Sequence, residues 1–216
     1  MTIIKKIPPL LLLLAVIGDF SLPYFLGPDY PGFDQMTMLI SQLGEASSPV
    51  QSTFNHGSVL TGSLFILGSL GVYSFFAAES KRMAQILTGA IALYGFGDCI
   101  LTGIVHIRES ANFFSPAYFL HAAFSGIAMV AMMFVPLLLA YESSLKGKKG
   151  LAGFYLICLV IAVITLILFA AYYLPVIGDL LTTTRGFWQR ASLLFLYLPA
   201  ATLAIRQLRH SSSTTE

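Results

Sequence analysis

The chain has few charged residues for its length. Of its 216 residues, 10% are Asp, Glu, Lys or Arg, whereas 56% are hydrophobic, and the mean hydropathy is +0.81. This composition excludes an ordinary soluble domain and is typical of an integral membrane protein. The net charge of +2 is small and its basic residues are scattered, so the sequence does not indicate a nucleic-acid partner.

Cysteine and short catalytic motifs are equally scarce. Cys99 and Cys158 both lie inside hydrophobic runs. We therefore predict no disulfide framework and interpret both as small buried apolar residues. The chain has no internal repeat, no Gly-rich phosphate loop and no zincin-type motif, which removes the enzyme classes that those motifs define.

Long hydrophobic runs, in contrast, are abundant. A membrane-spanning helix needs about 20 mostly apolar residues, and six stretches qualify: 7–26, 56–78, 83–105, 116–141, 151–174 and 186–208. We predict an all-α protein, an integral membrane six-helix bundle. Residues 1–208 then form a single transmembrane domain, and the polar residues 209–216 form a disordered cytoplasmic tail.

The connections between these runs alternate in charge. Lys and Arg gather before the first run, between the second and third, between the fourth and fifth, and after the sixth: Lys5, Lys6, Lys81, Arg82, Lys146, Lys148, Lys149, Arg206 and Arg209. The opposite connections carry Arg108 and Arg185, with Arg190 just inside a run. The positive-inside rule therefore predicts a multi-pass protein of the plasma membrane with both termini in the cytoplasm.

The first outer connection, residues 27–55, is long for so small a protein. It holds three prolines and three acids but no Lys or Arg. Four apolar residues within it have helical spacing, which predicts a short interfacial helix that Gly44 ends: Met36, Leu39, Ile40 and Leu43. Such a segment is either a binding element or lid, or a surface helix that closes the bundle.

The same connection carries a family signature. The segment LISQLGE at 39–45, followed by Pro49, the pair Phe54–Asn55 and Gly62, resembles bacterial six-span proteins grouped as domain-of-unknown-function family 998. His121 also matches a histidine of that group, whereas Gln42 stands where the family often has an acid. The resemblance implies six spans in a bacterial inner membrane. A fainter likeness reaches the Frag1/DRAM/Sfk1-type proteins, some of which are tied to membrane lipids.

Five ionisable residues in or at the edge of the runs fall in the outer half of the membrane: Asp19, His56, Asp98, His121 and Arg190. Such groups are costly in hydrocarbon and normally face a bundle interior or a wet cavity. In the third run, Tyr94, Asp98, Thr102 and His106 follow one another at four-residue spacing, and Ser125 lies one turn from His121. Because the depths match across four helices, we predict a shared polar pocket.

Three interpretations of this pocket stay open. In the first, Asp19 or Asp98 pairs with Arg190 and only fixes helix packing. In the second, Arg190 and Arg185 hold an acidic lipid head group; the other predicted ligand-binding residues are Glu45, Asn55, His56, His106 and Gln189. In the third, His121 is a general base that Asp98 or Asp19 orients, and it activates Ser125 or a water against an ester.

Zinc is a variant of the third interpretation, with His56, His106, His121 and Asp98 as ligands. No paired His motif supports it, so we predict no metal and no cofactor. The leading hypothesis is a membrane protein of unassigned activity whose outer pocket binds a lipid or small amphiphile, with membrane lipids as partners. The alternatives are an intramembrane lipid hydrolase or acyl transferase, and a structural or partner-binding protein; protein partners stay unknown.

Overall fold

The computed structural model describes residues 2–105, 115–171, 174, 178 and 181–213. Over these residues the chain forms helices and turns and contains no β-strand. Six helical segments are long and apolar enough to cross a membrane: Ile4–Asp29, Gln51–Phe76, Lys81–Ile104, Pro116–Leu145, Lys149–Ala171 and Arg185–Ser212. The predicted all-α six-helix bundle is therefore confirmed.

Four of the six segments contain one long helix each. These are α1 (Thr2–Leu26), α2 (Gln51–Phe76), α7 (Lys149–Ala171) and α9 (Arg185–Ser213). Helix α2 begins earlier than the hydrophobic run at 56, and α9 ends later than the run at 208. The reason is the same at both ends: backbone hydrogen bonding continues a helix through polar residues that a hydropathy window does not count. Residues 209–213 are thus helical, whereas a disordered tail was predicted for 209–216; residues 214–216 lie outside the described residues.

The third and fourth segments are each interrupted. The third consists of α3 (Lys81–Tyr94), a π-helical stretch η3 (Gly95–Leu101) and α4 (Thr102–Ile104). The fourth consists of α5 (Pro116–Met132) and α6 (Phe134–Leu145), with the break at Met133. Pro136 explains that break, because its nitrogen has no hydrogen to donate to the carbonyl of Met132 four residues earlier.

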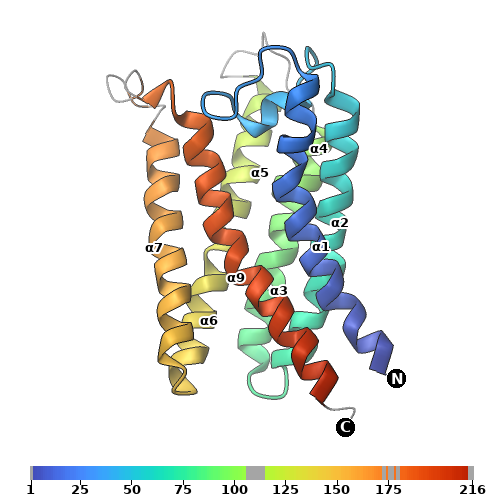
Figure 1. Ribbon diagram of the computed structural model, residues 1–216, viewed down its shortest axis with the longest axis vertical. Helices are drawn as coiled ribbons and strands as arrows, with labels where there is room; N and C mark the ends of the chain where they lie inside the picture. Colours follow the sequence, from blue (N-terminus) through green and yellow to red (C-terminus); the bar gives the residue numbers. More distant parts are fainter. Residues whose placement is uncertain (1, 106–114, 172–173, 175–177, 179–180, 214–216) are drawn as a thin grey trace.

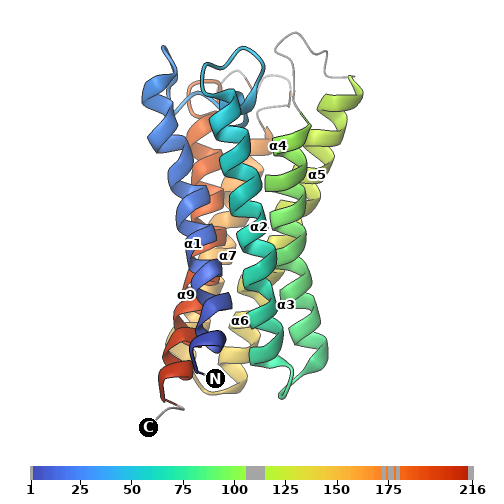
Figure 2. The same ribbon diagram turned by 90° about the vertical axis from the view of Figure 1, so that its right-hand side faces the viewer.

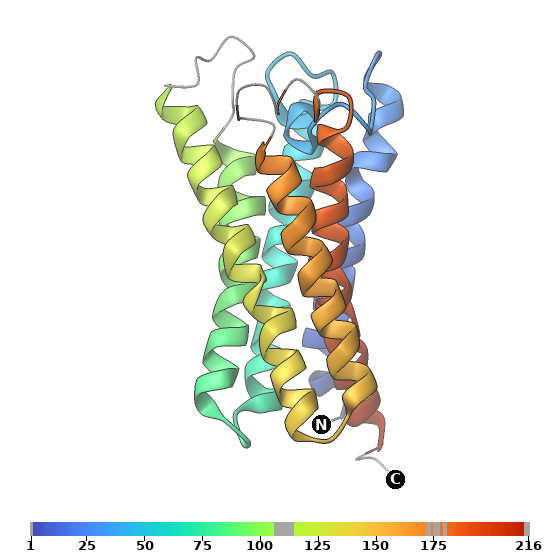
Figure 3. The ribbon, with the colours of Figure 1, turned by 90° about the vertical axis from the view of Figure 1, so that its left-hand side faces the viewer.

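The six segments form a ring in which α6 lies between α3 and α7. Helix α1 packs between α2 and α9, and α7 packs between α9 and α6. Helix α3 packs between α2 and α5. Helix α1 begins and α9 ends at the same end of the bundle (Figures 1 and 2), which we call the terminal end. Residues 27–50 cover the opposite end, which we call the loop end. Helices α5 and α7 diverge toward the loop end (Figure 3).

A buried ion cluster holds the terminal end together. Both carboxylate oxygens of Glu142 accept hydrogen bonds from Nη2 of Arg206, at 3.0 and 3.1 Å, and Glu142 is 3% exposed. Lys146 bonds to Glu142 at 2.8 Å and to the more exposed Glu79 at 2.7 Å. Burial lowers the pKa of Lys146, but the hydrogen bonds to the two carboxylates outweigh it and raise that pKa. The cluster therefore ties α6 to α9 and to the turn between α2 and α3.

The segment over the loop end has its own apolar core. Its short helices are η1 (Gly27–Asp29) and η2 (Ile40–Gly44), the second of which is the predicted interfacial helix in 3-10 form. Leu43, Val50 and Phe54 are buried together under this segment.

Asp34 accepts hydrogen bonds from the backbone of Thr37 and Met36, which lower the pKa of its carboxyl.

Candidate functional site

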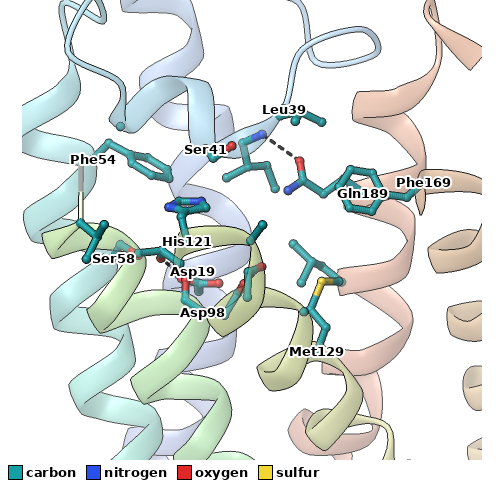
Figure 4. A pocket seen from close by; sticks show the side chains of 18 of the residues that line it. Asp19, Leu39, Ser41, Phe54, Ser58, Asp98, His121, Met129, Phe169 and Gln189 are labelled. Atoms are coloured by element: carbon teal, nitrogen blue, oxygen red, sulfur yellow. Dashed lines mark hydrogen bonds between the residues drawn. The ribbon is translucent and has the colours of Figure 1, made fainter. Parts of the chain in front are cut away.

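A cavity of about 590 Å³ lies beneath the loop segment, inside the bundle. Its wall comes from seven of the helical elements, α1, α2, η3, α4, α5, α7 and α9, and its roof is η2 (Figure 4). Seven of the predicted catalytic and ligand-binding residues line it together: Asp19, Glu45, Asn55, Asp98, His121, Ser125 and Gln189. Four separate hydrophobic runs thus meet at one polar site.

Asp98 is held at the floor of the cavity by hydroxyl donors. Its Oδ1 accepts a hydrogen bond from Ser125 on α5, and its Oδ2 lies 2.8 Å from the Tyr94 hydroxyl. Asp98 belongs to the π-helical stretch η3. Within this stretch η3 packs closely against α5, since a Cβ on Gly97 would lie 3.0 Å from the Phe124 carbonyl. Such π-bulges are frequent at functional sites.

Asp19, on α1, forms the second half of the floor. Its Oδ1 accepts a hydrogen bond from Thr61 at 2.8 Å, and its Oδ2 accepts one from the hydroxyl of Tyr197. The Tyr197 hydroxyl also contacts the Tyr94 hydroxyl. A continuous row of oxygens therefore joins the carboxyls of Asp19 and Asp98 through two tyrosines.

Tyr197 was not predicted as a site residue, and Tyr94 was placed on the polar stripe of the third run without a role of its own. Tyr94 and Tyr197 are fully buried in the main core, where Phe65 packs against both rings. In the sequence each stands in an apolar run and reads as a core residue. The only available signal was the position of Tyr94 four residues before Asp98, which places both side chains on one helix face.

The His121 side chain lies between the floor and the roof of the cavity. Figure 4 shows its ring between the two aspartates and the Phe54 and Ser41 side chains. The ring is hydrogen-bonded to the backbone of Val105, and its Nδ1 is buried without a hydrogen-bond partner among the described residues. The base predicted to be oriented by Asp98 or Asp19 is instead oriented by a backbone group.

The segment LISQLGE at 39–45 forms the roof of the cavity. Leu39, Ile40, Ser41, Gly44 and Glu45 all line the cavity. Gln189 on α9 accepts the backbone N–H of Ile40 at 2.9 Å (Figure 4), and Asn55 donates to the carbonyl of Gly44 at 3.2 Å. A side chain at position 44 would collide with Phe54 and Asn55, so the glycine is needed for this close approach.

Arg190 and Arg185 are placed differently from the prediction. Arg190 is 5% exposed, yet it does not line the cavity. Its guanidinium donates to the side chain of Gln35 at 2.7 Å and to the carbonyls of Met38 and Gly186. Arg185 donates to the carbonyl of Thr37 at 2.9 Å. Both arginines hold the loop segment down because its turns present carbonyls, so neither pairs with the floor aspartates.

Among the described residues, His56 does not join His121 at the cavity. His56 is exposed on α2, where its Nδ1 contacts the carbonyl of Ser52 one turn earlier, and it does not line the cavity. His106 lies outside the described residues. Within those residues, no three His, Cys, Asp or Glu side chains are grouped so as to hold a metal ion.

The cavity has a side opening between α5 and α7. Four of its lining residues are also exposed on the surface of the bundle: Ala122, Gly126, Val130 and Ala170. The first three are spaced by four residues and form one stripe along α5. A Cβ added at Gly126 would meet no atom within 4 Å, so the stripe borders open space.

Comparisons with known proteins give one match. A family model described as "Protein of unknown function (DUF998)" matches residues 13–206. No curated protein and no solved structure matches the chain. The match includes at least part of each of the six spans and covers most of the chain, so the protein belongs to the DUF998 family.

Proposed function

We infer that this DUF998 protein is a membrane protein whose cavity binds a lipid or other amphiphile. The observation that carries the proposal is the division of the cavity into two chemistries. Polar atoms of Asp19, Asp98 and Ser125 lie at its floor, whereas Leu166, Phe169 and Met129 give it apolar walls. Small-molecule sites of about 300–1,000 Å³ have this apolar lining with few polar groups.

The side opening supports entry from the bilayer. It faces outward between two membrane-crossing segments, and the residues on its edge carry no charge: Ala122, Gly126, Val130 and Ala170. The surrounding surface of α5 and α7 exposes large apolar side chains such as Ile127 and Ile167, as lipid-facing helices do. In this arrangement the acyl chain stays in the opening and the head group reaches the floor.

Closing the opening tests the proposal. Gly126→Phe adds a ring to empty space at the opening and so leaves the fold intact. Gly89→Phe is the matched control, because Gly89 is exposed on α3, also has an empty surrounding, and does not line the cavity. Native mass spectrometry and lipid extraction of the purified proteins should find lipid bound to wild type and to Gly89→Phe, with at least a fivefold loss in Gly126→Phe. Lipid-free wild type, or equal binding in both variants, would overturn it.

We place the cavity in the outer half of the plasma membrane. The basic residues at the terminal end support this orientation. Labelling of cells with a membrane-impermeant maleimide tests it, because the native cysteines Cys99 and Cys158 are buried and give little background. Asp29→Cys at the loop end should react in intact cells, and Lys148→Cys only after lysis. The reverse pattern would invert the orientation.

A lipid hydrolase is the second candidate, and one contact favours it. The Ser125 hydroxyl donates to Asp98, so Asp98 rather than His121 is in place to remove its proton. In that case purified protein should release fatty acid from an ester lipid and lose this activity on Ser125→Ala. Binding without turnover leaves the first proposal standing and removes the second.

A further inference from the structure

The number of protons at the cavity floor limits the charge of the ligand that fits there. Four oxygens stand in a row: Asp98 Oδ2, Tyr94 Oη, Tyr197 Oη and Asp19 Oδ2. The row contains three contacts of hydrogen-bond length, and each hydrogen bond needs one proton. A tyrosine hydroxyl supplies one proton and an ionised carboxylate supplies none. Two tyrosines therefore provide two protons for three bonds.

The missing proton belongs to the carboxyl pair. The neighbouring donors on Asp19 and Asp98 act on the other carboxylate oxygen of each residue and do not enter the row: Thr61, Cys99 and Ser125. With one carboxyl protonated, all donors in the row point the same way and all three bonds form. Two carboxyls that share a buried site cannot both remain charged at low cost, which favours the same state. The floor then carries one negative charge.

This charge is not matched by a lysine or arginine among the described residues that line the cavity. The polar atoms near its floor with free hydrogen-bonding capacity are acceptors, namely the carboxylate oxygens with spare lone pairs and the unpartnered Nδ1 of His121. The side chains of Ser41 and Gln189, which carry donor groups, lie at the roof instead (Figure 4). A buried charge is costly without a partner of opposite sign. The floor is therefore short of one positive charge and of hydrogen-bond donors.

We propose that Asp19 and Asp98 hold a single proton between them through Tyr94 and Tyr197, and that the cavity takes an amphiphile with a primary ammonium head group. An ammonium group brings one positive charge and three N–H donors, which fits one negative charge among acceptors. The head-group assignment rests on the proposed function, whereas the shared proton rests on the row of oxygens alone.

Infrared spectroscopy of the purified protein at neutral pH tests the shared proton. Wild type should show the carbonyl band of a protonated carboxyl group. Asp98→Asn and Asp19→Asn should each abolish the band, because the asparagine amide donates into the row and no extra proton is needed. Asp29→Asn, at an exposed acid, should keep it. A band that is absent from wild type, or that survives in either floor variant, overturns the shared proton.

Three amphiphiles of one chain length test the head group: dodecylamine, 1-dodecanol and dodecanoate. Wild type should bind dodecylamine at least tenfold more tightly than the other two, Asp98→Asn should lose at least tenfold, and Asp29→Asn should not change. Equal binding of all three, each lost in Gly126→Phe, would keep the cavity as a lipid site and overturn the ammonium preference. Tighter binding of dodecanoate would overturn it too. Failure of all three to bind would overturn the proposed function as well.

Discussion

Replacing Arg190 with alanine separates a residue that binds ligand from one that holds the roof of the cavity. The guanidinium makes three hydrogen bonds, to Gln35 at 2.7 Å, to the Met38 carbonyl at 2.8 Å and to the Gly186 carbonyl at 3.0 Å. Two of these reach the loop segment across more than 150 residues of chain. The Phe33 ring also lies 5.7 Å from the guanidinium carbon. Alanine removes all of these contacts at once.

The expected loss follows from these bonds. A hydrogen bond to a charged group contributes about 1.5–3 kcal/mol, and a buried acceptor left without a donor is penalised as well. The variant also no longer has to bury a guanidinium, which returns several kcal/mol. Together these effects lower the free energy that favours the closed loop by roughly 3 kcal/mol. Each 1.4 kcal/mol changes an equilibrium constant tenfold. Local opening should therefore become about 100-fold more frequent.

Hydrogen exchange measured by mass spectrometry reads this opening directly. The amides of Met38, Leu39 and Ile40 are hydrogen-bonded within or beneath the loop and should exchange about 100-fold faster in Arg190→Ala. Arg206→Ala is the control, since it breaks the cluster at the terminal end and should leave these amides unchanged. Exchange within threefold of wild type in Arg190→Ala would show that the arginine does not hold the loop.

Three further predictions concern the stability of the bundle. Gly62→Ala should lower the free energy of unfolding by about 2 kcal/mol, because the new Cβ would lie 2.8 Å from Cys99 and Ile100 atoms and against the Gly95 carbonyl. Gly89→Ala, where no atom lies within 4 Å of the new Cβ, should raise the free energy of unfolding by up to about 1 kcal/mol. Equal effects of the two substitutions in denaturant titrations would contradict the close packing at Gly62. Glu142→Gln should cost about 3 kcal/mol in thermal unfolding by leaving Arg206 unpaired, whereas Glu79→Gln, at an exposed acid, should cost under about 1 kcal/mol; similar losses would refute the buried role of Glu142. The pKa of Lys146 is raised in the folded state, so its contribution to stability is full below the ordinary lysine value of 10.5 and disappears as pH rises through the raised pKa. Lys146→Gln should flatten this alkaline decline, and an unchanged pH profile would refute the assignment.

The helices were predictable from hydropathy, but their interruptions were not. Each span follows from about 20 apolar residues in a row, which is a local property of the chain. The π-helical stretch around Asp98 depends on Gly62, Gly95 and Gly97 allowing three helices to approach closely. That approach is a contact between distant segments, so no pattern within one span indicates it. The break at Met133 did have a local signal in Pro136, which the hydropathy reading passed over.

The depth of the site residues was predictable, whereas their rotation about each helix axis was not. Asp19, Asp98, His121 and Gln189 were expected at one level, and they meet at one cavity. Arg190 lies next to Gln189 in the chain, yet it turns about 100° away around the helix and reaches the loop carbonyls instead. Hence the interpretation in which Arg185 and Arg190 hold an acidic head group does not fit the cavity, whose lining includes Asp19, Asp98 and Glu45 but neither arginine.

By itself, the sequence determined that the chain crosses a membrane six times and that polar residues of several spans share one half of it. The physical reason is the cost of charge in hydrocarbon, which acts on each residue separately and is readable from the chain. Only the tertiary structure decided that two tyrosines link Asp19 to Asp98, that the arginines serve the roof, and that the cavity opens between α5 and α7. These features depend on which helix faces which, and packing among distant residues sets that choice.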